Sequence, residues 1–313
     1  MTLEGAGVVA GPGGKRVLVP GALAGEQISF RRERRRRNFD EGLLLEVLRP
    51  SLQRAVPACE YFSRCGGCSL QHLEPAAQLV LKQASLLDCL ERIGKVTPKQ
   101  ILAPISAAAW GYRRRARLAV RHVAKKGRVL VGFREREQPR VVDMLSCQTV
   151  HPVVSRLLPA LSELVGALSI RARLPQIEVT VADNATALVL RVLDTPGSGD
   201  MDTLREFALR HTLRIYLQSG GPESVVPLDP LQADDDLCYA IPAWGLSLRF
   251  GPVDFIQVHP EVNLRMIDQA IGLLEPLATD RVLDLYCGIG NFTLPLAKCA
   301  GEVTGIEGAR PAV

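Results

Sequence analysis

The sequence predicts an α+β protein of several domains: a small N-terminal β-barrel, a mixed β-rich central domain, and the start of an α/β domain. Two observations support this fold class. Short β-rich runs separated by glycines fill the first fifty residues or so, and a strand, a glycine turn, a helix and a second strand follow one another near the end. The 313 residues are enough for two or three domains of about 100–200 residues each.

Charge is divided unevenly along the chain. The net charge of +5 is the sum of +14 over residues 1–156 and −9 over residues 157–313. Of the 38 basic residues, 31 are arginine, which can bind phosphate in a bidentate manner. The basic half is therefore expected to face a polyanion such as RNA, and the alternative is a solvated arginine-rich surface.

The N-terminal barrel is expected over residues 1–52, with strands near residues 16–19, 28–30 and 43–48. Six arginines stand among the seven residues 31–37, directly after the second of these strands. Like charges at this density repel one another unless phosphate neutralises them, so the run favours nucleic-acid binding. A disordered linker is the alternative.

A cysteine-rich loop opens the central domain, which is expected over residues 53–250. Cys59, Cys65 and Cys68 lie close together around two glycines, and Cys147 is a distant fourth candidate. Thiolates at this spacing can hold a metal ion or a cluster, and the spacing alone does not decide between zinc and iron–sulfur. Disulfides or buried thiols are the alternatives. The four other cysteines are interpreted as small buried apolar residues: Cys89, Cys238, Cys287 and Cys299.

The rest of the central domain alternates strands and helices. Helices are expected over residues 76–93, 153–168 and 201–211; strands over 117–123, 129–133, 177–181, 187–192 and 214–217; and a polar loop over 219–236. The segment WGYRRRARL, residues 110–118, places four arginines beside two aromatic residues. This pattern suits phosphate contacts and base stacking, and the alternative is a charged edge strand.

The third domain is expected over residues 251–313. It contains a helix over 260–274, a strand over 281–286, a turn at 288–290, a helix over 291–298 and a strand over 302–306. The turn carries the pattern D-x-x-x-G-x-G-N from Asp284, and Glu307 follows the second strand, where it can accept hydrogen bonds from ribose hydroxyls. Because no pyrophosphate has to be bound, S-adenosylmethionine (SAM) fits this pattern better than a dinucleotide.

In this order, the cysteine loop, WGYRRRARL, DFIQV and VLDLYCGIGNFTLPLA resemble the RNA uracil-C5 methyltransferase family, and most closely its type that acts on 23S rRNA. The resemblance implies a TRAM-like, OB-type RNA-binding barrel and a Rossmann-like SAM-binding domain. It also implies a 4Fe–4S cluster held by the four cysteines already named: Cys59, Cys65, Cys68 and Cys147. SAM is expected on four residues, with Asp284 a weaker candidate: Gln257, Tyr286, Asn291 and Glu307.

The implied reaction transfers a methyl group from SAM to C5 of a flipped-out uridine. In the family a cysteine thiolate adds to C6 of the base, and a general base later removes the C5 proton. These catalytic residues are expected beyond residue 313, so this chain is predicted to be C-terminally truncated and inactive alone. His259 stands where the family has asparagine, and the first strand of the barrel is expected to be short.

The sequence shows neither a signal peptide nor an apolar run long enough to span a membrane, so a cytoplasmic protein without a membrane partner is expected. The resemblance implies 23S rRNA as partner, and a monomer that does not bind DNA is expected. Three alternatives remain open. They are a non-catalytic RNA-binding iron–sulfur protein, a tRNA uridine-C5 methyltransferase and a zinc-binding RNA module.

Overall fold

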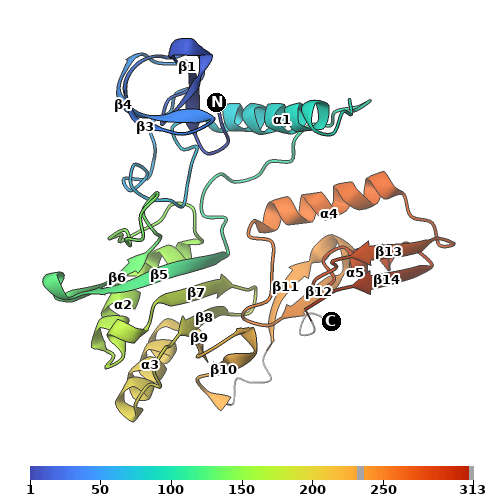
Figure 1. The fold of residues 1–313 in the computed structure, drawn as a ribbon. Helices are drawn as coiled ribbons and strands as arrows, with labels where there is room; N and C mark the ends of the chain where they lie inside the picture. Colours follow the sequence, from blue (N-terminus) through green and yellow to red (C-terminus); the bar gives the residue numbers. More distant parts are fainter. Residues whose placement is uncertain (231–235, 310–313) are drawn as a thin grey trace. The chain divides into compact units, whose positions relative to one another are not determined.

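A computed structural model describes residues 1–230 and 236–309 of the chain. The chain divides into two compact units, Met1–Pro104 and Ile105–Val313. Both contain strands and helices, so the expected mixed α/β architecture of several parts is confirmed (Figure 1). In the described residues, none of the helices is both long and apolar enough to cross a bilayer.

The first unit is built on a four-stranded sheet. Its strands are β1 (Ala6–Ala10), β2 (Arg16–Pro20), β3 (Gln27–Arg35) and β4 (Phe39–Arg49), in the order β1-β2-β4-β3. Strands β2 and β4 run parallel and the other neighbours antiparallel. Val17, Val19 and Ala22 form the core beneath it. The arginine run lies mostly on β3, in an exposed strand and its turn, so the alternative of a disordered linker is wrong.

A buried ion pair ties this sheet to the segment that follows it. The Glu26 carboxylate, which has no exposed side-chain surface, accepts hydrogen bonds from Arg54 Nε at 2.5 Å and Arg54 Nη2 at 2.6 Å. The backbone N–H groups of Leu23 and Ser51 also donate to this carboxylate. The cysteine loop comes next, and helix α1 (Pro75–Arg92) follows it as expected.

The second unit contains a six-stranded sheet with the order β10-β9-β8-β7-β5-β6. Its strands are β5 (Arg115–Val123), β6 (Arg128–Gly132), β7 (Gln176–Val181), β8 (Thr186–Arg191), β9 (Leu213–Gln218) and β10 (Val225–Pro227). Only β10 was unexpected: the segment predicted as a polar loop contains this short edge strand, and residues 231–235 of that segment lie outside the described residues. Helices α2 (Pro152–Ala167) and α3 (Ser198–His211) pack beside this sheet (Figure 1).

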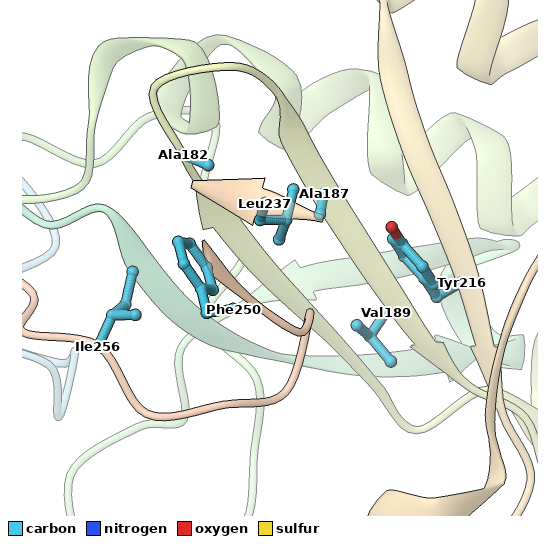
Figure 2. Close-up of a cluster of buried hydrophobic side chains, with 7 residues drawn as sticks. All are labelled: Ala182, Ala187, Val189, Tyr216, Leu237, Phe250 and Ile256. Atoms are coloured by element: carbon cyan, nitrogen blue, oxygen red, sulfur yellow. The ribbon is translucent and has the colours of Figure 1, made fainter. Parts of the chain in front are cut away.

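An apolar cluster joins a hairpin to this sheet. Strands β11 (Leu237–Ile241) and β12 (Leu246–Phe250) form the hairpin, and their Leu237 and Phe250 pack with Val189 and Tyr216 of the sheet (Figure 2). Ile256 belongs to the same cluster, so the segment after β12 is anchored as well. This anchoring fixes the backbone immediately before Gln257.

The end of the chain forms a βαβ unit. Helix α4 (Pro260–Leu274) precedes β13 (Arg281–Leu285), α5 (Thr293–Leu296) and β14 (Glu302–Ile306), and β13 pairs with β14 in parallel. The helix expected over residues 291–298 is therefore only four residues long. A second cluster, with Ile267, Ile271 and Leu296 at its centre, packs α4, the hairpin and the βαβ unit together.

Candidate functional site

The turn after β13 adopts an unusual backbone. Tyr286, Gly288 and Gly290 all have positive φ angles, of 62°, 55° and 87°. A left-handed conformation is costly for tyrosine, and here the carbonyl of Ile306 stabilises it by accepting the N–H groups of Tyr286 at 2.7 Å and Cys287 at 3.1 Å. The Tyr286 side chain is 89% exposed, and a Cβ built at Gly288 would meet no atom within 4 Å. The turn thus offers an aromatic ring and open backbone to a ligand.

Glu307 closes this turn from the neighbouring strand. Its carboxylate accepts hydrogen bonds from the backbone N–H groups of Ala309 and Gly288, both at 2.9 Å. These bonds lower the pKa of Glu307, so the side chain is an anion at neutral pH. Each carboxylate oxygen retains acceptor capacity beyond one bond, which suits a ligand hydroxyl. Asp284 instead accepts the hydroxyl of Thr293 at 2.6 Å, which supports the start of α5.

Asn291 lies at the other end of the turn and belongs to a hydrogen-bonded group of three side chains. Its Oδ1 accepts from Tyr239 Oη at 2.8 Å and from Asn263 Nδ2 at 2.9 Å, and its Nδ2 donates to Asn263 Oδ1 at 2.9 Å. Tyr239 comes from β11 and Asn263 from α4. Two separate elements, β11 and α4, therefore set the orientation of one amide.

Sequence reasoning missed Tyr239 and Asn263, although α4 carried a usable pattern. Asn263, Ile267 and Ile271 recur every four residues and are the buried residues of the helix. An asparagine on the apolar side of an amphipathic helix needs a buried hydrogen-bonding partner. The pattern could have singled out Asn263, but nothing in it names Asn291 as the partner.

Gln257 lies on the wall of a cavity of about 170 Å³. Both Tyr239 and Asn263 line the same cavity, so it connects Gln257 with the side chains that hold Asn291. The remaining lining residues are Arg114, Val181, Ala182, Asp183, Ala240, Pro242, Phe250, Ile256, Pro260 and Leu264. Of the four residues expected to bind SAM, Gln257 lines this cavity, whereas Asn291 is hydrogen-bonded to two of its lining residues. Tyr286 and Glu307 lie at the turn that ends at Asn291.

The arginines of WGYRRRARL largely bind carboxylates of the protein itself. Arg115, mostly buried, and Arg117 both bind Glu178, at 3.1 Å and 2.7 Å, and Arg114 pairs with Asp183. Arg115 also donates to the carbonyl of Val253 at 2.9 Å, which attaches the segment leading to Gln257 to the sheet. The structure therefore gives Arg115 a structural role, rather than the exposed phosphate-binding role that the pattern favoured.

His259 caps helix α4. Its Nδ1 accepts the N–H of Val262 at 3.4 Å, its Nε2 lies 3.0 Å from the carbonyl oxygen of Ala108, and its ring stacks on Tyr112 at 4.4 Å. His259 thus provides the capping that asparagine also provides, and in addition holds the segment containing Ala108 and Tyr112.

The expected metal ligands divide between the two units. Cys59, Cys65 and Cys68 lie in one loop of the first unit, and Cys147, which is buried, lies in the second. The N–H of Gly67 donates to Cys65 Sγ at 3.4 Å, a contact of the kind that stabilises thiolates. Across residues 1–230 and 236–309, no group of three or more His, Cys, Asp or Glu side chains is arranged to hold a metal ion. The prediction for Cys89 is wrong, because this residue is exposed on α1, and Cys238, Cys287 and Cys299 are only partly buried.

A glycine turn between two parallel strands, with an acidic residue after the second strand, is the arrangement expected of a methyltransferase, and comparisons with known proteins show the family. Residues 76–313 match the tRNA (Uracil-5-)-methyltransferase family, and the chain belongs to this family. It is 49% identical over 299 residues to the 23S rRNA (uracil(1939)-C(5))-methyltransferase RlmD of Cupriavidus necator, and 48% identical over 299 residues to that of Burkholderia thailandensis.

These two alignments cover 96% of this chain but only 67% and 64% of the relatives, so the chain spans about two thirds of their length. Among solved structures, the fold resembles Pyrococcus abyssi tRNA (uracil-54, C5)-methyltransferase in complex with S-adenosyl-L-homocysteine. The TM-score is 0.68 and the identity 20%, with coverage of 98% of this chain and 74% of that one.

Proposed function

We propose that this chain contributes to SAM-dependent methylation of C5 of a uridine in 23S rRNA. The observation that carries the proposal is the glycine turn that Glu307 holds through Gly288, whose last residue Asn291 is bonded to two side chains of the cavity lined by Gln257, in a chain 48–49% identical to RlmD enzymes. Fold resemblance to a tRNA methyltransferase at 20% identity does not bear on the choice of RNA.

In this proposal four residues hold SAM: Gln257, Tyr286, Asn291 and Glu307. The Glu307 anion accepts ribose hydroxyls, the exposed Tyr286 ring packs on the ligand, and the Asn291 amide donates to it. SAM supplies the methyl group. The tightly held turn between β13 and α5 requires little reordering on binding, which favours affinity.

Residues 1–52 are proposed to form a TRAM-like RNA-binding barrel, residues 53–250 a central domain, and residues 251–313 the N-terminal part of a Rossmann-like SAM domain. Support for RNA binding comes from the exposed arginines of β3 and its turn. Arg35 and Arg37 are exposed and have no acidic partner in the parts of the chain that are described, whereas Arg36 is bound to Glu41 at 2.9 Å. Unneutralised arginines on an exposed strand suit phosphate contacts.

A 4Fe–4S cluster on Cys59, Cys65, Cys68 and Cys147 is part of the proposal. It is supported by the grouping of three thiols in one loop and by the N–H of Gly67 on Cys65 Sγ. Anaerobic reconstitution with iron and sulfide tests it: a broad visible absorbance band that oxygen bleaches supports the cluster, and a colourless protein that retains zinc contradicts it.

The protein is further proposed to act as a monomer in the cytoplasm, without DNA or membrane partners.

The functional test combines two titrations of the full chain: S-adenosylhomocysteine by calorimetry, and undermodified 23S rRNA against bulk tRNA by filter binding. Binding of the nucleoside together with preference for the rRNA supports the proposal. Preference for tRNA favours the tRNA enzyme, and no binding of the nucleoside favours a non-catalytic RNA-binding protein.

A second assay measures transfer of tritiated methyl groups from SAM to undermodified 23S rRNA. Transfer of tritium to this rRNA would support the proposed activity directly.

A further inference from the structure

We propose that Tyr239 and Asn263 are positioning residues that orient the Asn291 amide so that it presents a single N–H donor to the ligand. This inference rests on the proposed SAM site and goes beyond it, since neither residue belongs to the binding motif. It also assigns a chemical direction to Asn291: the ligand atom opposite its amide must be a hydrogen-bond acceptor.

The amide pair is closed on itself. Asn263 and Asn291 exchange two hydrogen bonds, each of 2.9 Å, so each side chain donates once and accepts once. Such a reciprocal pair leaves both amides coplanar and permits little rotation. Asn263 is only 5% exposed, so its own orientation is fixed by the packing of α4 beside Ile267 and Ile271.

Tyr239 reinforces this orientation of the Asn291 amide. Its hydroxyl donates to Asn291 Oδ1 at 2.8 Å, and this second donor fills the acceptor capacity of that oxygen. Burial raises the pKa of Tyr239, so the phenol keeps its proton and remains a donor. With Asn263 held in place, flipping the Asn291 amide alone would set NH₂ against NH₂ and oxygen against oxygen, so the reciprocal pair selects one orientation and the hydroxyl bond adds to it.

The count of donors then determines what Asn291 offers. Its Oδ1 has two partners and its Nδ2 has one, so within the described residues one N–H of Nδ2 has no protein acceptor. Asn263 and Tyr239 both line the cavity of about 170 Å³ that also includes Gln257. A carboxylate, hydroxyl or ring nitrogen of the ligand can accept that N–H; a ligand group that only donates cannot.

The test uses Tyr239→Phe, which removes the donor and keeps the ring that packs against Phe250 at 5.9 Å. Tyr216→Phe is the matched control, because Tyr216 is a buried tyrosine in the apolar cluster beside the sheet. Calorimetry with S-adenosylhomocysteine is expected to show about three- to tenfold weaker binding for Tyr239→Phe, and no change for Tyr216→Phe. Equal affinities of the wild type and Tyr239→Phe would overturn the inference while leaving the proposed function intact.

A double-mutant cycle separates positioning from general destabilisation. In an Asn291→Ala background, Tyr239→Phe is expected to have no further effect on affinity, because the group it orients is absent. Additive losses would show that Tyr239 acts independently of Asn291 and would overturn the inference.

NMR supplies a readout that needs no ligand. One of the two side-chain amide protons of Asn291 is expected to exchange slowly with solvent because Asn263 accepts it, and Tyr239→Phe is expected to speed up that exchange. An unchanged exchange rate would contradict the inference. If the wild-type chain fails to bind the nucleoside, the proposed function fails and the ligand-directed part of the inference fails with it, whereas the NMR result still decides whether the three side chains act together.

Discussion

Glu307, at the carboxyl end of β14, accepts the backbone N–H of Gly288, in the turn that follows β13, at 2.9 Å. An acidic residue of one strand thereby stabilises the glycine turn of its neighbour. The same carboxylate also accepts the N–H of Ala309, so one side chain holds the backbone of the turn and of the segment after β14. Glu307 thus shapes the turn, and it is also the residue proposed to accept ligand hydroxyls.

Glu307→Gln keeps one acceptor oxygen but replaces the other with a donor, which faces a backbone N–H. We expect S-adenosylhomocysteine to bind about tenfold or more weakly to this variant, because a charge-assisted acceptor is lost and the turn is disturbed. Calorimetry measures the affinity. Glu302→Gln is the control: Glu302 lies on the same strand and binds only Arg281 at the surface, so its affinity should match the wild type.

The pH dependence of Glu307 follows from the direction of its shift. The pKa of Glu307 is lowered in the folded protein. Its ionised carboxylate therefore adds to the free energy of unfolding above the ordinary pKa of a glutamate, and this contribution is lost as the pH falls through the lowered pKa. Thermal denaturation of the wild type and Glu307→Gln should differ at neutral pH and converge in acid. A constant difference down to low pH would contradict this role.

His259→Asn tests the one substitution within the family motif. Asparagine is a good N-cap, so α4 should remain intact and nucleoside affinity should stay within about twofold of the wild type. The contact with Ala108 and the stack on Tyr112 are lost, so amide hydrogen exchange of residues 106–112 should accelerate. His259→Ala is the comparison: it loses the cap as well, and residues 260–264 should then exchange faster too.

The spacing of apolar residues and the positions of proline and glycine were enough to predict α4, β14 and most of the strands in the sheets. These elements are long or are bounded by proline or glycine. Strand β10 was missed because three residues on a sheet edge carry no periodicity, and its pairing with β9 depends on tertiary contacts. The helix expected over residues 291–298 is longer than α5, because the first residues of the apparent helical pattern belong to the turn that precedes α5.

The site divides in the same way. Gln257, Tyr286, Asn291 and Glu307 belong to local motifs that a sequence displays. Tyr239 is distant in sequence from Asn291, and its contact arises only when β11 packs beside the βαβ unit. Similarly, Glu178 converts Arg115 from an apparent RNA contact into a structural residue, and no local pattern links those two positions.

Glu26→Gln should destabilise the first unit by about 2–4 kcal/mol, because it leaves the guanidinium of Arg54 without its buried counter-charge. Burial alone raises the pKa of Glu26, but the bonds from Arg54, Leu23 and Ser51 outweigh it and lower the pKa to about 2. The contribution of the Glu26 carboxylate to the stability of the first unit is therefore complete above the ordinary glutamate pKa and is lost as the pH falls towards 2.

The first unit contains neither of the two tryptophans, so tryptophan fluorescence does not report on its unfolding. Its local stability is measured by amide hydrogen exchange of residues 16–30 and 43–55. Glu33→Gln is the matched control, because the Glu33–Arg31 pair is exposed and should contribute less than about 1 kcal/mol. Similar exchange rates for the two variants would contradict the structural importance of the Glu26–Arg54 pair.

Arg35→Ala and Arg37→Ala should each weaken binding of undermodified 23S rRNA and make it less dependent on salt. Both side chains are exposed without an acidic partner in the described residues, so phosphate is the expected counter-charge. Each lost phosphate contact should reduce the slope of log K against log salt concentration by about 0.7–0.9.

Arg36→Ala is the matched control: Glu41 already neutralises that arginine, so its removal should change the slope much less. Filter binding over a series of salt concentrations measures all three variants. Equal slopes for Arg35→Ala, Arg37→Ala and the wild type would show that RNA does not contact this part of β3 and its turn.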